Sequence, residues 1–314
     1  MAKKVVYYFC ISKDRPGTVS RLVWQVLEQK GIFEKTELMF DNHEVMSYHN
    51  QAGDIFYFVP TDRPICWNYP KYLPEMNEKF GDCDFAGMVT WHEGASAPLK
   101  VLTVHSIGDV NSGVYGPAKP NYMRNILLAM EKNRLALGLT DFQVVTEATH
   151  WSGIAISGTD PKLILEYPVP IVDIEVGSEK ESWENETACE ALANAILHVF
   201  ADDERKVHNI LGIGGIHFDP NFAEAIFTQW DNDAFGVSHI IANQWLVDGE
   251  YEGEDGLEFA SRAIEAIDGG VELIVFHDGL KACYKNLARV LAAKYNVPAL
   301  RHQRIRNPQE LEWK

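Results

Sequence analysis

The chain has 314 residues, 46% of them hydrophobic and 23% charged, which is the composition of an ordinary globular protein. Its formal net charge of -17 argues against a protein that coats nucleic acid nonspecifically, and it leaves room for a local basic site. The five cysteines are scattered and form no Cys-x-x-Cys pair, as is typical of a reducing compartment. This cysteine pattern predicts a cytoplasmic protein, and because no apolar stretch is long enough to span a bilayer, we expect no membrane partner.

The first apolar run, residues 5–11, follows two lysines and superficially resembles a signal peptide. It is too short for one, and Ser12-Lys-Asp-Arg-Pro follows it where small residues would be expected. The run therefore predicts a first β-strand.

Apolar, β-rich runs alternate with helical patterns along the chain. Strands are predicted at residues 5–10, 55–59, 86–91, 101–105, 142–148, 171–176, 209–213, 273–277 and 299–305. Helices are predicted at residues 17–29, 122–137, 179–200, 220–230, 257–267 and 280–295. Ser178 and Glu181 are interpreted as a capping box at the start of the third helix.

This alternation predicts a three-layer α/β/α fold with a mixed, largely parallel sheet. Several predicted strands are continuously apolar, as expected where helices cover both faces of a sheet. The sequence has no internal repeat and no low-complexity linker, so we expect a single domain over residues 1–314. The acidic segment from Asp248 to Gly256 is the best candidate for an internal break and is interpreted as a solvated loop.

The most informative motif is a glycine-rich turn that ends one predicted strand and opens the next helix. Gly214 and Gly215 allow a tight turn and a close approach to a ligand, and Asp219-Pro220 is typical of a helix start. His217 therefore stands between a strand end and a helix N-terminus, a place that favours an anion. The motif lacks the residues of a P-loop or a dinucleotide fingerprint, so no nucleotide cofactor is expected. The plainer alternative is a turn that only connects two elements.

Histidines recur at or just beyond the ends of apolar runs. If the strands are parallel, several of these side chains converge at one edge of the sheet, where imidazole can act as base, metal ligand or donor. Any single one is more often structural, and it is the recurrence that favours a site. No His-Glu-x-x-His and no short-spaced Cys/His set occurs, so spacing assigns no metal ligand. The histidines concerned are His92, His105, His150, His217, His239 and His277.

Carboxylates accompany two of these strand ends. Glu147 precedes His150 by three residues and could orient that ring, although a surface pair is the alternative. Alternation along a strand puts Asp173 and Glu175 on one face, ahead of a turn at Ser178 that offers a second helix N-terminus. A plain strand-to-helix connection remains open for that segment. No Gly-x-Ser-x-Gly elbow occurs, which argues against a serine α/β-hydrolase.

Taken in chain order, four segments resemble the archaeal and plant type of D-aminoacyl-tRNA deacylase. Residues 102–109, Leu-Thr-Val-His-Ser-Ile-Gly-Asp, look like the Thr-Val-His…Gly-Asn segment of that family, and residues 147–150 are similar to its Glu-Ala-Thr-His-His-Gly-Pro. Residues 174–183 are similar to its Glu-Ile-Gly-Ser-Thr-Glu-x-x-Trp, and residues 212–220 to its Gly-x-Gly-Gly-x-His-Tyr-x-Pro. The segment from Phe235 to His239 looks like the Phe-Gly-His element of the family with extra residues.

The chain departs from the family pattern at several positions. Trp151 stands where the second consecutive histidine is expected, and Ser152-Gly153 replaces Gly-Pro. Asp109 replaces the usual asparagine, and Phe218 the tyrosine. Loss of the His-His pair removes one candidate base or metal ligand, which suggests a divergent member.

The resemblance implies an α/β/α fold of the phosphorylase/hydrolase-like kind and hydrolysis of the ester that joins a D-amino acid to the 3′ end of tRNA. It also implies that zinc can be bound, without assigning the ligands. Under this hypothesis His150 or His217 activates water or binds a metal, Glu147 orients His150, and His105 belongs to the same catalytic set. The residues expected to bind substrate are Gly214, Gly215, Asp219, Glu175 and Ser178.

A basic stretch near the end of the chain fits a tRNA partner. Residues 279–309 contain no Asp or Glu, and Lys281, Lys285 and Arg289 are spaced by four on a predicted helix. Such a stripe on an acidic protein is a candidate phosphate-binding surface, and a solvated helix face is the alternative.

Two further hypotheses stay open from the sequence. The same cleft could serve a small-molecule hydrolase or phosphorylase without tRNA, as the Trp151 replacement suggests. Alternatively, the protein could bind a tRNA end or a nucleotide without turnover, because function belongs to the site and not to the fold. No hypothesis includes a DNA partner.

Overall fold

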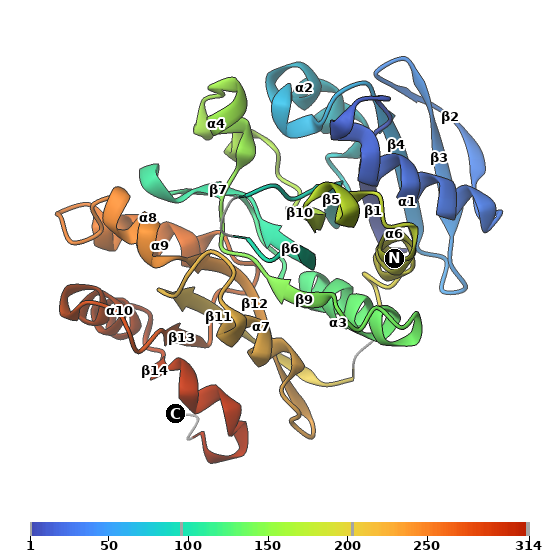
Figure 1. Cartoon of the computed structure of the whole chain (residues 1–314). Helices are drawn as coiled ribbons and strands as arrows, with labels where there is room; N and C mark the ends of the chain where they lie inside the picture. Colours follow the sequence, from blue (N-terminus) through green and yellow to red (C-terminus); the bar gives the residue numbers. More distant parts are fainter. Residues whose placement is uncertain (1, 95–96, 202–203, 312–314) are drawn as a thin grey trace.

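The computed structural model describes residues 2–94, 97–201 and 204–311 (Figure 1). Its strands are β1 (Lys4–Cys10), β2 (Glu34–Phe40), β3 (His43–His49), β4 (Ile55–Thr61), β5 (Phe85–Trp91), β6 (Lys100–Ser106), β7 (Gly108–Asp109), β8 (Val114–Tyr115), β9 (Gln143–Thr146), β10 (Ile171–Ser178), β11 (Lys206–Ile213), β12 (Asp233–Ile241), β13 (Leu273–Phe276) and β14 (Ala299–Arg301). Its α-helices are α1 (Thr18–Gln29), α2 (Tyr69–Phe80), α3 (Pro120–Ala136), α4 (Ser152–Ser157), α5 (Lys180–Trp183), α6 (Glu186–Ile196), α7 (Pro220–Phe227), α8 (Asn243–Asp248), α9 (Gly256–Glu265) and α10 (Ala282–Tyr295).

Most strands belong to one of two sheets. The first has eight strands in the order β2-β3-β4-β1-β5-β10-β6-β9, and its central strands β4, β1, β5 and β10 are parallel. The second has four strands in the order β12-β11-β13-β14, all parallel. Figure 1 shows the second sheet and its helices, in brown to red, gathered beside the first. The predicted mixed, largely parallel α/β class is confirmed, with the strands divided between two sheets.

Helices cover both faces of the first sheet. Alternate side chains of β1 point to opposite sides, so that Tyr7 packs in the core beneath α1 and α6 while Tyr8 packs in the core beneath α2. Both side chains are almost fully buried, which explains why this strand is continuously apolar in sequence.

The second sheet is also covered on both faces. Ile274 of β13 packs in one core with Leu291 of α10, and its neighbour Val275 packs in another with Phe222 of α7. The three-layer arrangement expected from the sequence therefore occurs around each sheet.

The loop after β9 joins the two sheets. The Thr149 N–H donates to the Ile240 carbonyl on β12 (3.0 Å), and the Ala148 N–H donates to the His217 carbonyl beyond β11 (2.9 Å). These bonds hold the end of β9 against the carboxyl ends of β11 and β12 and so fix where the histidine-bearing segments meet.

The helix predicted over residues 179–200 is interrupted. Helix α5 ends at Trp183, and α6 begins after the N-cap residue Asn185, whose side chain accepts a hydrogen bond from the Ala188 N–H. The predicted capping box is wrong, because Ser178 is the last residue of β10 and its hydroxyl contacts the His92 ring instead.

Other elements also differ from the prediction. The strand predicted at residues 299–305 stops at Arg301, because residues 302–306 form a 3₁₀ helix. The hairpin β2–β3 and the strand β12 were not predicted, and neither was α2. None of the described helices is both long and apolar enough to cross a membrane.

Candidate active site

A fully buried carboxylate, Glu147, lies where the two sheets meet. Its backbone N–H donates to the Val104 carbonyl of β6, which holds the residue just beyond the end of β9. Its Oε1 lies 2.5 Å from His217 Nε2 and 3.5 Å from both His92 Nε2 and His150 Nε2. One carboxylate oxygen is therefore shared by three imidazoles.

Different strands deliver these imidazoles to one place. His92 directly follows β5, His105 lies near the end of β6, and His217 follows β11. The ring centroids of His105 and His150 are 4.0 Å apart, those of His150 and His217 are 4.8 Å apart, and those of His92 and His217 are 5.9 Å apart. The structure thus brings together four of the six histidines at strand ends.

The other two histidines at strand ends lie outside this cluster. Both ring nitrogens of the buried His239 are hydrogen-bonded, Nδ1 to the Thr149 hydroxyl (3.1 Å) and Nε2 to the Gly116 carbonyl (3.0 Å). His277 stacks on His302 with ring centroids 4.6 Å apart. His239 is therefore a structural residue of the core with both ring nitrogens hydrogen-bonded, as is usual for a buried histidine.

Backbone carbonyls set the tautomers of His105 and His150. The Nδ1–H of His105 donates to the Ser106 carbonyl (3.2 Å), and the Nδ1–H of His150 donates to the Ala148 carbonyl (3.0 Å). Burial lowers the pKa of His105 to about 4 and the pKa of His150 well below its ordinary value. Both rings are therefore neutral at pH 7, with a lone pair on Nε2 that faces the carboxylate side of the site.

The hydrogen bond from His217 keeps Glu147 ionised. Burial alone would raise the pKa of the Glu147 carboxyl, but the His217 Nε2–H that donates to Oε1 helps to lower it below its ordinary value. Glu147 Oε2 has no hydrogen-bond partner among the described residues. The site therefore holds a buried negative charge with one unused oxygen.

His217 is the member of the cluster most open to solvent. Its side chain is 29% exposed, while its ring lies 5.0 Å from the Phe218 ring and 5.1 Å from the Trp245 ring. Because Nε2 is bound to Glu147, the Nδ1 edge of the ring remains for a water or substrate.

The glycine-rich turn positions His217. Gly214 and Gly215 have φ angles of 92° and 77°, and a Cβ on Gly215 would stand 2.1 Å from Asp219 Oδ2. The Asp219 carboxylate accepts hydrogen bonds from the Asn221 N–H (2.9 Å) and the Ile216 N–H (3.3 Å). Asp219 thus takes up N–H groups at the start of α7 that could otherwise have met an anion.

The predicted residues of β10 lie on the inner side of the cluster. Asp173 Oδ2 and Glu175 Oε1 lie 3.5 and 3.9 Å from His105 Nε2. Burial, together with the charge of Glu147, raises the pKa of both carboxyl groups. The Ser178 hydroxyl lies 2.8 Å from His92 Nδ1. All three side chains contact histidines of the cluster, and the two carboxylates lie on the same face of β10, as the alternation along the strand predicted.

The basic residues predicted to bind tRNA lie on the outer side of the second sheet, Lys285 and Arg289 on α10 and Lys281 at its N-cap. Leu280, next to Lys281, packs over Gly214, so the start of α10 is near the glycine-rich turn. Lys281 and Arg289 are exposed and Lys285 is half-buried. The stripe is thus separate from the histidine cluster.

Two parts of the site were missed. His92 was seen at a strand end but not included in the catalytic set, although its position after β5 matches that of the others. Trp245, whose ring also stacks on that of His150 at 5.8 Å, gave no signal in the sequence because it comes from the short helix α8.

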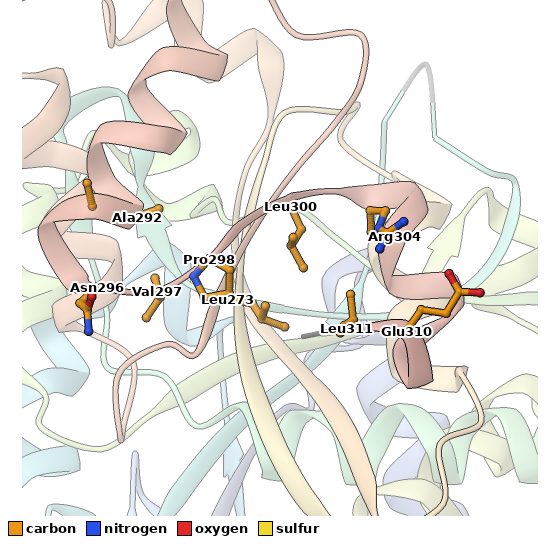
Figure 2. Close-up of a pocket in the computed structure, with 10 residues that line it drawn as sticks. Leu273, Ala292, Asn296, Val297, Pro298, Leu300, Arg304, Glu310 and Leu311 are labelled. Carbon is orange, nitrogen blue, oxygen red and sulfur yellow. The ribbon is translucent and has the colours of Figure 1, made fainter. Parts of the chain in front are cut away.

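A cavity of about 630 Å³ lies elsewhere, between α10 and the last residues of the described chain (Figure 2). Leu273, at the start of β13, Pro298 and Leu311 line it. It opens at the amino end of β13, whereas the histidine cluster lies at the carboxyl ends of the strands. It is therefore not part of the candidate site.

Comparison with known proteins agrees with this geometry. A family model described as D-aminoacyl-tRNA deacylase matches residues 79–300, which include every member of the histidine cluster. The chain belongs to the D-aminoacyl-tRNA deacylase family.

This chain aligns with archaeal relatives of the same name over different fractions of their lengths. The D-aminoacyl-tRNA deacylase of Pyrococcus abyssi is 29% identical over 91% of this chain and 97% of its own length. Those of Haloarcula marismortui and Pyrococcus horikoshii are 30% and 28% identical, over 57% and 60% of this chain. These two matches span only 38% and 65% of the relatives' own lengths.

A solved structure supports the fold. A crystal structure of a conserved protein of unknown function aligns with a TM-score of 0.75 over 98% of this deacylase-family chain and 97% of its own. The two sequences are 20% identical, so the likeness concerns the architecture alone.

Proposed function

We propose that the protein hydrolyses the ester bond between a D-amino acid and the 3′ end of tRNA, as the names of its relatives indicate for them. One observation carries this proposal: the buried carboxylate of Glu147 is hydrogen-bonded to the partly exposed His217 at the meeting point of the two sheets. A carboxylate–imidazole pair of this kind is suited to activating water for attack on an ester.

The hydrogen bond to Glu147 decides which nitrogen of His217 can act. The Nε2–H donates to the carboxylate, so the lone pair is on Nδ1, which can take a proton from water as the water oxygen attacks the ester carbonyl. The negative charge of Glu147 stabilises the imidazolium that results. That imidazolium returns the proton to the ribose oxygen as the ester C–O bond breaks, giving the free amino acid and tRNA.

The site also fits a zinc ion, and we propose that His105, His150 and Glu147 would hold it. Neutral imidazole nitrogens and a carboxylate are ligands that zinc prefers, and their ligand atoms lie within 4.8 Å of one another. Both histidines donate Nδ1–H to a backbone carbonyl, as metal-binding histidines usually do, and His105 Nε2 lacks a hydrogen-bond partner in the described part of the chain. A bound zinc would acidify a water or polarise a carbonyl.

The partner proposed for this activity is tRNA. The stripe of Lys281, Lys285 and Arg289 offers three positive charges at the N-cap and along the first turns of α10, in a segment without acidic residues from 279 to 309. Positive side chains at this spacing suit contact with the phosphate backbone of an RNA.

The Trp151 replacement bears on the alternative that the chain binds without turnover. Trp151 is buried and packs with its ring 5.0 Å from that of Tyr69, in the apolar core beneath α2. Three other histidines still contact Glu147, so the replacement of the second consecutive histidine by Trp151 leaves a base and its carboxylate in contact. This favours an enzyme over a binding protein.

The test is to incubate the protein with D-Tyr-tRNA and L-Tyr-tRNA and follow the release of tyrosine. We expect faster release of D-tyrosine than in buffer and little release of L-tyrosine. Release of neither above the buffer rate would reject the activity. Metal analysis of the purified protein and of His105→Asn tests the zinc site separately, since we expect the variant to retain less zinc.

A further inference from the structure

A second cavity lies close to the candidate active site, between α1 and α5. Its volume is about 590 Å³. Four cationic side chains and one indole line it: Lys13, Arg15, Arg21, Lys180 and Trp183. Lys13 follows β1 and Lys180 follows β10, so the cavity opens at the carboxyl ends of the parallel strands, as the histidine cluster does.

The charge of this cavity is opposite to that of the protein. Its four cations face two lining carboxylates, those of Glu184 and Glu186, in a chain whose formal net charge is -17. Lys180 Nζ lies 3.7 Å from Glu184, a long contact between two largely exposed side chains. Lys13 has no ion pair within the described ranges. Arg15 is paired with Glu93 and Arg21 donates to the Ser12 carbonyl, so the cations left for a ligand are Lys13 and Lys180, and these favour an anionic ligand.

The cavity and the histidine cluster share a wall. The Trp183 indole N–H donates to the His92 carbonyl (2.8 Å), and Arg15 forms an ion pair with the next residue, Glu93 (2.9 Å). His92 in turn lies 3.5 Å from Glu147. A ligand whose reacting bond is at Glu147 and that extends past His92 would therefore reach the cations of this cavity.

We propose that this cavity binds the single-stranded 3′ end of an RNA, at the nucleotides that precede the esterified terminal nucleoside. Lys13 and Lys180 would contact phosphodiester oxygens, and a base would lie against the Arg15 guanidinium, which itself lies over the Trp183 ring at 5.8 Å from the centroid. Positive side chains combined with a planar group, either an aromatic ring or an Arg guanidinium, are the usual means of holding single-stranded RNA, because every base has a face that can stack. This inference rests on the proposed function and adds the part of the substrate that the cavity recognises.

The test compares two esters in the double variant Lys13→Gln/Lys180→Gln. D-Tyr-tRNA carries the phosphodiester chain, whereas 3′-O-D-tyrosyl-adenosine has the same ester and no phosphate. We expect kcat/KM on D-Tyr-tRNA to fall by roughly tenfold, and its dependence on log salt to lose about two units of slope. On tyrosyl-adenosine we expect no change, since neither lysine touches the ester.

The matched control is Lys30→Gln/Lys132→Gln, which removes the same charge from exposed positions at the end of α1 and on α3. This control should leave kcat/KM unchanged on both D-Tyr-tRNA and tyrosyl-adenosine. An equal fall in the control, an unchanged rate of the test variant on D-Tyr-tRNA, or a fall on tyrosyl-adenosine would each overturn the inference.

Binding separates this inference from the proposed function. If the wild type hydrolyses neither ester, the proposed function fails. Fluorescence anisotropy with a labelled CCA trinucleotide then tests whether the cavity binds RNA. An RNA site is supported if the trinucleotide binds about tenfold more weakly to Lys13→Gln/Lys180→Gln than to the wild type. Inorganic phosphate at the concentration of the trinucleotide should then not displace it. No binding, equal binding by the variant, or full displacement by phosphate contradicts it.

Discussion

At the scale of single residues, Glu147 explains why the histidines gather. A buried carboxylate without partners is costly, and here the His217 Nε2–H donates to one of its oxygens, while His92 and His150 Nε2 lie 3.5 Å from the same oxygen. The shortest of these contacts, to His217, also links the buried charge to solvent, because His217 is 29% exposed. Glu147 therefore supplies the buried negative charge, and His217 supplies the base that solvent can reach.

His217→Asn tests the base directly. Asparagine keeps hydrogen-bonding groups but cannot take up a proton at neutral pH, so we expect turnover of D-Tyr-tRNA to fall by about 10² or more. Folding should change little, because the glycines and Asp219 set the turn. A variant with a lowered Tm and normal activity in the folded fraction would remove His217 from the site.

Asp173 gives a prediction for the pH dependence of stability. Burial raises the pKa of the Asp173 carboxyl to about 8, with a contribution from the charge of Glu147. The folded protein then keeps a proton that the unfolded chain releases near pH 4, so this residue costs stability as the pH rises from there.

Asp173→Asn removes that loss, because an amide does not ionise. We expect the difference in Tm between the variant and the wild type to shift in favour of the variant as the pH rises from 4 to 8. The exposed Asp231→Asn serves as the control and should follow the wild type at every pH. A constant difference between Asp173→Asn and the wild type would show that the carboxyl does not change its charge on unfolding.

At the scale of elements, the break between α5 and α6 shows where periodicity misleads. The apolar stripe from Ala188 onward continues the helical pattern. In the sequence, a polar residue such as Asn185 fits the exposed face of one long helix as well as the N-cap of a new helix. Only its side-chain bond to the Ala188 N–H reveals the new start. The exposed strands β2 and β3 were missed for a related reason, because much of their surface faces solvent and they lack a continuous apolar run.

The cap of α6 is open to a direct test. Asn185→Ala should lower the free energy of unfolding by about 1 kcal/mol, because it leaves the Ala188 N–H without its partner. Glu181→Ala removes the residue expected to act in the capping box and should not lower the stability. Urea denaturation measures both, and a larger loss for Glu181→Ala would restore the capping box.

Helix α10 carries the prediction about tRNA. Lys281→Gln/Lys285→Gln/Arg289→Gln should weaken the binding of tRNA and reduce its salt dependence by up to three units of slope. Filter binding at several salt concentrations measures this. An unchanged affinity and slope would assign the stripe to a solvated helix face and favour a small-molecule substrate.

At the scale of the whole molecule, the site depends on how two sheets meet. The sequence predicted the α/β class and most of the strands whose ends carry histidines. It could not place His92 beside Glu147, because this contact joins β5 to β9 through strand neighbours that only the topology reveals. It also could not predict the cavity at Trp183, which combines residues after β1 with residues after β10.

The central claim is that Glu147 and His217 together hydrolyse the ester of D-aminoacyl-tRNA, and single-turnover release of D-tyrosine from D-Tyr-tRNA tests it most directly. We expect the wild type to exceed the buffer rate, and Glu147→Gln to lose at least about 10² of that rate, because a neutral amide cannot stabilise the imidazolium of His217. A folded Glu147→Gln that releases D-tyrosine as fast as the wild type would contradict the claim.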